Sequence, residues 1–240
     1  MRSVKSLLRI ARELSKPSTF PYWLIDRTLE RRPFVDQFIH KYDLNVERVF
    51  HIGANDGAEA KHYSQRGIET YFFEAIPSVY EKLTANCAAF PDQHAIQACL
   101  SDEVGEVEFN VASNRGRSSS MLELGEHAEI FPTVAYVDKV TLKTERLDDL
   151  IADGRAPSDV DVAVLDVQGA EIKVMSGAPE FIASPRLKGL CLEASIADLY
   201  VGGAGVADLI KFLEPHGFYL RDVSINATGF GDAFFLRRWW

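Results

Sequence analysis

The chain has 240 residues, of which 47% are hydrophobic and 25% are charged; this composition is typical of a soluble globular protein and excludes collagen-like and disordered classes. Its net charge of -9 argues against nucleic acid as a partner, because general nucleic-acid binding needs clustered positive charge. No apolar run approaches the roughly 18 residues of a membrane span, and charges interrupt residues 4–14, which argues against a signal peptide. We therefore expect a cytoplasmic protein.

Cysteine and histidine spacing predicts no metal site. The three cysteines, Cys87, Cys99 and Cys191, lie far apart and form no CxxC pair, so neither a zinc site nor a disulfide framework is expected. The histidines are scattered, without partners at ligand spacing. Buried free thiols in a reducing compartment agree with the cytoplasmic expectation.

Residues 1–47 are predicted to form a helical extension. Apolar residues between positions 4 and 14 recur at helical spacing, with Arg and Lys between them. A second helix is predicted to begin at Pro33. The first helix either lies on an anionic membrane surface or packs on the main domain or on a second subunit of a homo-oligomer. Packing is favoured, because one short basic helix binds membranes weakly.

Residues 48–240 are predicted to form one α/β domain. Strands are expected at residues 48–53, 69–74, 94–100, 160–167, 187–192, 218–223 and 232–238. Helices are expected at residues 58–65 and 77–89, from residue 170, and at residues 205–215. This alternation indicates parallel strands joined by right-handed crossovers. The short link between the last two strands favours an antiparallel pair.

Residues 104–144 interrupt the alternation and are predicted to form a β-rich insertion. Residues 107–111 and 137–142 alternate between apolar and polar, as in strands exposed on one face. Between them, the polar residues 114–120 are expected to form a flexible serine-rich loop. Loops of this kind often carry substrate contacts.

The first candidate site follows the first strand, in the sequence HIGANDG at residues 51–57. Glycine lets the backbone approach a ligand, and the helix that follows offers free N–H groups. Glu74 ends the next strand, where a carboxylate can accept two hydrogen bonds from a ribose diol. Dinucleotide-binding domains share these features, but the G-x-x-x-G spacing of Gly53 and Gly57 departs from G-x-G-x-x-G. Glycines needed only for packing remain the alternative.

Two further segments stand out. Asp166 ends a strongly apolar strand, so it is expected at the same sheet edge as Glu74. Gln168 lies two residues after Asp166. A charged residue at that sheet edge is costly to bury unpaired and rarely lacks a function, although Asp166 can also cap the next helix. The segment GDAFFLRR at residues 231–238 reads as an edge-type strand with a structural role.

Together these segments resemble the FkbM-type S-adenosylmethionine-dependent methyltransferase family. The matching segments are residues 52–57 (IGANDG), 73–77 (FEAIP), 100–102 (LSD), 144–148 (TERLD), 165–171 (LDVQGAE) and 231–235 (GDAFF). The resemblance implies the class I methyltransferase fold, a Rossmann-like, doubly wound seven-stranded sheet whose last strand is antiparallel. It also implies S-adenosylmethionine as the cofactor.

The resemblance assigns roles to residues around the expected cofactor. Gly53, Asn55 and Gly57 would line the methionine part, Glu74 would hold the ribose, and Ile76 would pack on the adenine. Asp166 would lie near the methyl donor and face the acceptor. Ser101 and Asp102 would lie beside the adenine edge. The remaining expected cofactor residues are His51, Ala54, Ala75 and Gln168. The family usually has aspartate at the position of His51 and glutamate at that of Gln168.

The predicted activity is O-methyl transfer to a hydroxyl of a small molecule, sugar or glycan. A hydroxyl acceptor must lose its proton, so a general base helps, and Asp166, His51 and Glu193 are the candidates at strand ends. Acceptor contacts are expected from Arg115, Arg117, Ser118 and Ser119, since two arginines can grip a phosphate or carboxylate. A solvated loop is the alternative there. Two other classes stay open: a module that binds the cofactor without methyl transfer, and an NAD-dependent oxidoreductase.

Overall fold

The computed structural model describes residues 34–238, which divide into two compact units at Leu44 and Asn45. In the first unit, helix α3 (Phe34–Lys41) has Asp36 in its first turn and Lys41 in its last. This is the helix predicted to begin at Pro33. The basic stripe predicted at residues 4–14 lies outside the described residues, so its two interpretations remain predictions.

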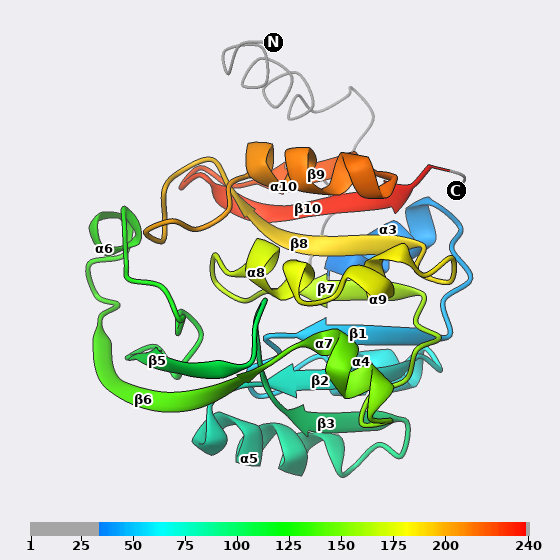
Figure 1. Ribbon diagram of the computed structural model, residues 1–240, viewed down its shortest axis with the longest axis horizontal. Helices are drawn as coiled ribbons and strands as arrows, with labels where there is room; N and C mark the ends of the chain where they lie inside the picture. The colour runs from blue at the N-terminus through cyan, green and yellow to red at the C-terminus, as the bar shows by residue number, and fades with distance from the viewer. Residues whose placement is uncertain (1–33, 239–240) are drawn as a thin grey trace, which may run out of the picture. The chain divides into compact units, whose positions relative to one another are not determined.

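The second unit is built on a seven-stranded sheet of residues 48–237 (Figure 1). Its strands are β1 (Arg48–Ile52), β2 (Glu69–Glu74), β3 (Gln93–Gln97), β7 (Val162–Leu165), β8 (Gly189–Ser195), β9 (Phe218–Ile225) and β10 (Phe230–Arg237). They lie in the order β3-β2-β1-β7-β8-β10-β9, and only β10 runs antiparallel to its neighbours. The chain order reverses between β1 and β7, and open α/β sheets bind ligands at such a switch point. The predicted doubly wound sheet is confirmed.

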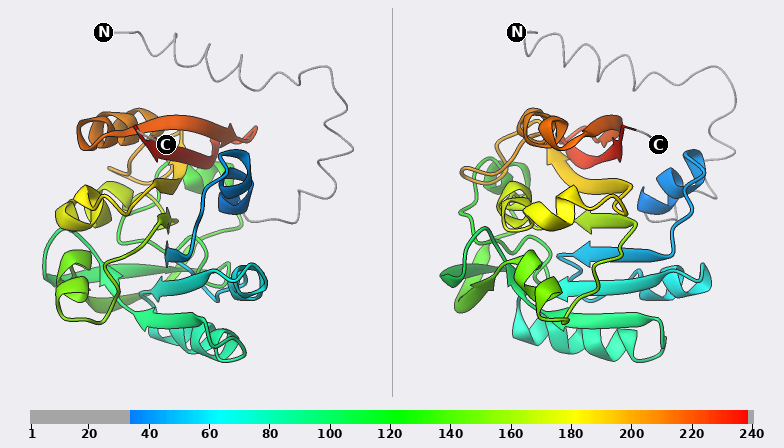
Figure 2. Two further views of the ribbon diagram at one scale, coloured as in Figure 1. Left: turned by 90° about the vertical axis from the view of Figure 1, so that its right-hand side faces the viewer. Right: turned by 45° about the vertical axis from the view of Figure 1, so that its right-hand side comes forward.

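Helices cover both faces of this sheet (Figure 2). Helices α4 (Ala60–Gln65) and α5 (Pro77–Cys87) pack on one face beside β2 and β3. The other face carries α7 (Leu147–Ala152), α8 (Glu171–Ser176), α9 (Pro179–Ala183) and α10 (Val206–Leu213), which leads into a 3-10 turn (Glu214–His216). Because both faces are covered, the central strands are mostly apolar. Phe50 of β1, for example, is fully buried and stacks on Phe181 of α9 with 5.3 Å between ring centroids.

The predicted β-rich insertion forms a three-stranded sheet beyond the carboxyl ends of β1 and β2 (Figure 1). Its strands are β4 (Cys99–Leu100), β5 (Gly105–Ala112) and β6 (Tyr136–Glu145), in the order β4-β6-β5, with helix α6 (His127–Ile130) between β5 and β6. The strand predicted at residues 94–100 is therefore two strands in different sheets. The apolar pattern alone could not locate the switch, because Cys99 and Leu100 are buried in the small sheet as they would be in the large one.

Two further expectations are corrected. Strand β10 is internal rather than an edge strand, because β9 pairs along its outer side. Its four consecutive residues 233–236 are all fully buried, which is typical of an internal strand. The serine-rich segment is packed rather than open, since Ser118, Ser119 and Ser120 are all buried. Among residues 34–238, no helix has the length and apolar character that crossing a membrane requires.

Candidate active site

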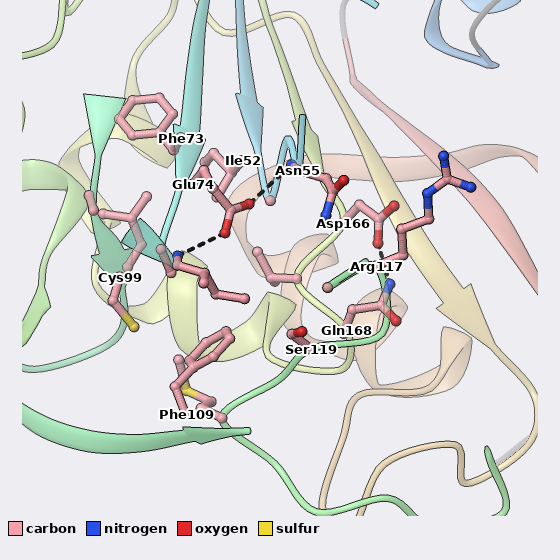
Figure 3. Close-up of a pocket in the computed structure, with 18 residues that line it drawn as sticks. Ile52, Asn55, Phe73, Glu74, Cys99, Phe109, Arg117, Ser119, Asp166 and Gln168 are labelled. Carbon is pink, nitrogen blue, oxygen red and sulfur yellow. Dashed lines mark hydrogen bonds between the residues drawn. The ribbon is translucent and has the colours of Figure 1, made fainter. Parts of the chain in front are cut away.

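Two adjoining cavities open at the switch point between β1 and β7. The Glu74 cavity, of about 60 Å³, is lined by Glu74 and the apolar residues around it. The Glu193 cavity, of about 620 Å³, is lined by Glu193, His51 and the loop residues around them. Gly53, Asn55, Arg117, Asp166 and Gln168 line both, so the two cavities form one crevice. Figure 3 shows Glu74 on one side of the smaller cavity and Asp166, Gln168 and Arg117 on the other.

The glycine turn after β1 brings the ends of two strands together. Gly53 has a φ of +80°, and a Cβ on it would lie 1.9 Å from the carbonyl oxygen of Asp166. Only glycine therefore allows the β1 turn to touch the β7 turn. Gly57 lines neither cavity; a Cβ there would lie 2.4 Å from Leu83 of α5, so the structure gives a packing reason for this glycine.

Glu74 is held at the end of β2 by backbone amides. Its Oε2 accepts a hydrogen bond from Asn55 N at 3.1 Å, and its Oε1 accepts one from Ile76 N at 2.8 Å (Figure 3). The side chain is buried, and this burial raises the pKa of Glu74 to about 7. Each carboxylate oxygen keeps a second lone pair, so two hydroxyl donors can still bind.

An apolar wall completes the Glu74 cavity. It is formed by Ile76, Ala98, Cys99, Leu100, Phe109 and Met121. Ser101 and Asp102, which were expected beside the adenine, line neither cavity. Instead, Ser101 Oγ donates to Asp102 Oδ1 at 2.8 Å, and Lys173 of α8 forms an ion pair with Asp102 at 3.2 Å. Sequence reasoning missed Phe109 and Met121, since both belong to the insertion and carry no motif.

The side-chain amide of Gln168 joins two carboxyl groups at the centre of the crevice. Gln168 Nε2 donates to Glu193 Oε2 at 2.8 Å and also to Asp166 Oδ1. The Tyr200 hydroxyl donates to Gln168 Oε1. Glu193 was expected after its strand, but it lies within β8, directly opposite Asp232 of β10. Asp166 follows the end of β7 and remains accessible from the Glu193 cavity.

Carboxyl groups crowd together around Asp166, and their pKa values rise. Loss of solvation within the crevice raises the pKa of Asp166, and burial together with the charge of Asp166 raises the pKa of Glu193 well above its ordinary value. Burial also raises the pKa of Glu171 and of Asp232 to about 7. Glu171 Oε1 accepts hydrogen bonds from Val167 N and Gly169 N, both at 3.2 Å. Neutral carboxyl groups are thus stabilised here near neutral pH.

His51 of β1 lies in the wall of the Glu193 cavity. Its ring stacks on Phe72 of β2, with 5.6 Å between centroids and 28° between planes. Its Nδ1 is buried and has no hydrogen-bond partner within residues 34–238, which leaves Nε2 as the ring nitrogen that can face the cavity. The stacking fixes the ring beside the crevice, where its charge, when protonated, would favour an ionised Asp166.

The serine-rich segment brings one of its two arginines into the site. Arg117 lines both cavities, whereas Arg115 lines neither and offers only its backbone carbonyl, which accepts from Asn55 Nδ2 at 3.2 Å. Ser119 lines the Glu74 cavity, and its Oγ accepts from Ala112 N at 2.9 Å. Ser118 lines the Glu193 cavity with its Oγ 3.1 Å from His127 Nε2.

The outer wall of the Glu193 cavity is largely apolar and aromatic. It is formed by His127, Phe131, Val134, Leu199 and Phe230, and Glu59 adds a carboxylate. The rings of Phe131 and Phe230 meet edge to face with 5.6 Å between centroids. None of these residues was predicted, because they come from loops, from α6 and from the first position of β10, where no periodic pattern marks them.

Comparison with known proteins agrees with this arrangement. The model of the methyltransferase FkbM domain matches residues 51–220. The 2-O-methyltransferase NoeI of Sinorhizobium fredii is 26% identical over 173 residues, which cover 69% of this chain and 70% of NoeI. The crystal structure of magnesium protoporphyrin IX methyltransferase (ChlM) from Synechocystis PCC 6803 shares the fold, with a TM-score of 0.50, 12% identity, and coverage of 98% of this chain and 94% of that one. The domain match spans well over half of the chain, so the protein belongs to the FkbM methyltransferase family that its sequence motifs predicted.

Proposed function

We propose that this methyltransferase transfers the methyl group of S-adenosylmethionine to a hydroxyl of a small molecule or sugar, with Asp166 as the general base. The position of Asp166 carries the proposal: it lies where the Glu74 cavity meets the larger Glu193 cavity. The 2-O-methyltransferase activity named for the relative NoeI supports a hydroxyl acceptor. Three buried free cysteines favour a reducing, cytoplasmic setting.

The residues of the Glu74 cavity fit S-adenosylmethionine. Glu74 offers two partly occupied carboxylate oxygens that suit a ribose diol, and the apolar wall of Ile76, Leu100 and Phe109 suits a flat adenine. When bound, the cofactor supplies a methyl group on a positively charged sulfur. Gly53, Asn55 and Asp166 line the part of the crevice where the cofactor's methionine end would approach the Glu193 cavity.

The chain's own residues would prepare the acceptor. The acceptor oxygen must come to about 3 Å from the methyl carbon, which requires a fixed pose and exclusion of water. The aromatic pair Phe131 and Phe230 can hold an apolar face of the acceptor, and Arg117 can bind a polar or anionic group. An Asp166 oxygen would then take the hydroxyl proton as the bond from the acceptor oxygen to the methyl carbon replaces the bond from that carbon to sulfur.

Asp166 is favoured over the other two candidate bases. Glu193 lines only the larger of the two cavities, and burial together with the Asp166 charge raises its pKa well above the ordinary value, which favours its protonated form. His51 is fixed by stacking on Phe72 and lines only the larger cavity. Asp166 alone among the three lines both cavities.

The test is an acceptor screen with S-adenosylmethionine and a panel of sugars and small hydroxylated molecules. Release of S-adenosylhomocysteine and methylated product is followed by mass spectrometry. With any acceptor found, Asp166→Asn should lower kcat by about 100-fold or more while S-adenosylhomocysteine still binds. Asp153→Asn, at the exposed end of α7, is the matched control and should keep full activity.

Each other outcome has a definite meaning. Full activity of Asp166→Asn would show that Asp166 is not the general base. His51→Ala and Glu193→Gln would then be tested for the same loss of kcat. Binding of S-adenosylhomocysteine without methylation of any acceptor would favour a binding module. Thermal stabilisation by NAD in place of the adenosyl compounds would favour an oxidoreductase instead.

A further inference from the structure

Gln168 is held in one orientation at the centre of the crevice. Both hydrogens of its amide nitrogen are used, one toward Asp166 and one toward Glu193, and its amide oxygen accepts from the Tyr200 hydroxyl. Turning the amide over would place its oxygen against two carboxyl groups and its nitrogen against a hydroxyl. The hydrogen-bond pattern therefore specifies which way the amide faces.

Three separate segments hold this amide. The backbone of Gln168 has a φ of +56°, a left-handed conformation that is costly for a residue other than glycine. Its carbonyl oxygen accepts from Ser120 Oγ of the serine-rich segment at 2.8 Å. Tyr200 reaches it from the loop after β8. Strain of this kind persists where the surrounding structure over-determines it, which is common at functional sites.

Carboxyl groups are the commonest ionisable groups around the carboxyl pair: Glu59 comes from the residue before α4, Glu171 from α8 and Asp232 from β10. The other ionisable groups are His51 of β1, Arg117 of the serine-rich segment, Cys191 of β8 and Tyr200 of the loop after β8. A carboxyl group at position 168 would add repulsion to this cluster and would lose the two amide donors. An amide donates two hydrogen bonds and adds no charge, so it can hold two carboxyl groups side by side.

We propose that Gln168, oriented by Tyr200, is a positioning residue for the general base: it keeps Asp166 beside Glu193 with one proton between them, so that Asp166 presents an ionised oxygen to the acceptor. The proposal rests on the function proposed above, in which Asp166 is the base. The electrostatics agree with a pair that holds one proton, because the charge of Asp166 is among the causes that raise the pKa of Glu193, so both groups do not readily ionise together.

The first test measures the titration of the carboxyl groups directly and needs no acceptor. Carboxyl carbon resonances of the ¹³C-labelled protein are titrated by NMR from pH 5 to 9, with Asp166→Asn and Glu193→Gln identifying the pair. In Gln168→Glu, the highest titration step of the pair should move up by about one pH unit or more, because a third carboxyl group is added. An unchanged titration in both Gln168→Glu and Gln168→Ala would overturn the proposal.

The second test uses the pH dependence of turnover with an acceptor from the screen. In Gln168→Glu, kcat at pH 7 should fall about tenfold and recover at higher pH, while the KM for S-adenosylmethionine stays unchanged. Tyr200→Phe removes the hydroxyl that orients the amide and should lower kcat by a smaller factor than Gln168→Glu does. The double variant Gln168→Ala/Tyr200→Phe should be no worse than Gln168→Ala alone, since the two residues act as one unit.

A matched control separates positioning from general structural damage. Gln93 of β3 is also buried, donates from Nε2 to the Ile68 carbonyl at 2.8 Å and lines neither cavity. Gln93→Glu should change neither the pair's titration nor the shape of the pH profile. A loss in Gln168→Glu that is equal at every pH would show a merely structural role and overturn the proposal.

The two proposals fail in different ways. If the wild-type protein methylates no acceptor, the proposed function fails, while the shifted NMR titration would still establish the amide's effect on the carboxyl pair. If the wild-type protein is active and Asp166→Asn is not, but substitutions of Gln168 leave both titration and pH profile unchanged, only the role of Gln168 is lost.

Discussion

At the scale of single residues, the burial of Glu74 has a consequence for cofactor binding. Its pKa of about 7 means that the free carboxyl group is partly protonated at neutral pH. A ribose diol donates two hydrogen bonds, and these favour the ionised form. Binding should therefore release a proton from Glu74 and strengthen as the pH rises through 7.

We predict that the affinity for S-adenosylhomocysteine increases about tenfold between pH 6 and pH 8. Isothermal titration calorimetry in buffers of different ionisation enthalpy measures both the affinity and the protons released. Glu74→Gln should bind more weakly and lose most of this pH dependence. Equal affinity across this range for the wild-type protein would show that the ribose does not bind an ionised Glu74.

The sequence predicts some site residues much better than others. Glu74 and Asp166 were predictable because each lies at the end of an apolar strand, and the carboxyl ends of parallel strands meet at one edge of a sheet. Tyr200 and Phe131 were not, because their positions depend on how loops fold over the sheet. Gly57 matches the family motif, but its contact with Leu83 is enough to require glycine at this position, without any ligand contact.

At the scale of elements, the serine-rich segment decides which arginine reaches the crevice. Ser118, Ser119 and Ser120 are buried and hydrogen-bonded to neighbouring parts of the insertion and to Gln168. This packing brings Arg117 to both cavities and leaves the Arg115 side chain outside them. The sequence pattern around the two arginines does not show which of them lines the crevice. Only the packing of the segment distinguishes them.

Arg117→Ala is therefore predicted to raise the KM for an anionic or polar acceptor by about tenfold, with a smaller change in kcat, because a charge-assisted hydrogen bond is lost. Arg115→Ala is the control and should leave the acceptor KM unchanged. Steady-state kinetics with the acceptor varied at saturating S-adenosylmethionine distinguish the two. Equal KM values for both variants and the wild-type protein would exclude the segment from acceptor binding.

The strand boundaries show which of them the hydrophobic periodicity of the sequence can predict and which it cannot. Strand β2 was predicted at its observed bounds, since turn residues border a short apolar run on both sides. The run at residues 94–100 instead spans two sheets, because the chain leaves β3 at Gln97 and pairs again with β6 at Cys99. Hydrophobic pattern reports burial but does not identify the partner strand.

At the scale of the whole molecule, two groups of carboxyl residues act on stability in opposite directions. Burial raises the pKa values of Glu74, Glu171 and Asp232 to about 7, so the folded state binds more protons than the unfolded state between pH 4.5 and 7. Stability from these groups is lost as the pH rises through that window. The pKa values of Asp161 and Glu69 are instead lowered by ion pairs and hydrogen bonds with Lys188 and Arg48, although burial opposes the shift. Their contribution is lost only as the pH falls below about 4.

We therefore predict that thermal stability is greatest near pH 5 and that Tm falls by roughly 10 °C or more between pH 5 and pH 8. A single carboxyl group buried like Glu74 contributes about 2.5 kcal/mol to this fall, and each kcal/mol shifts Tm by about 2–4 °C at this chain length, so one group lowers Tm by about 5–10 °C and the other two add to it. Burial lowers the pKa of His127, so this residue adds stability as the pH rises, but it is one group against several carboxyl groups. Calorimetry at each pH tests this: Asp232→Asn should reduce the fall and Asp153→Asn should not, whereas a Tm that rises toward pH 8 would show that these carboxyl groups are not protonated in the folded protein.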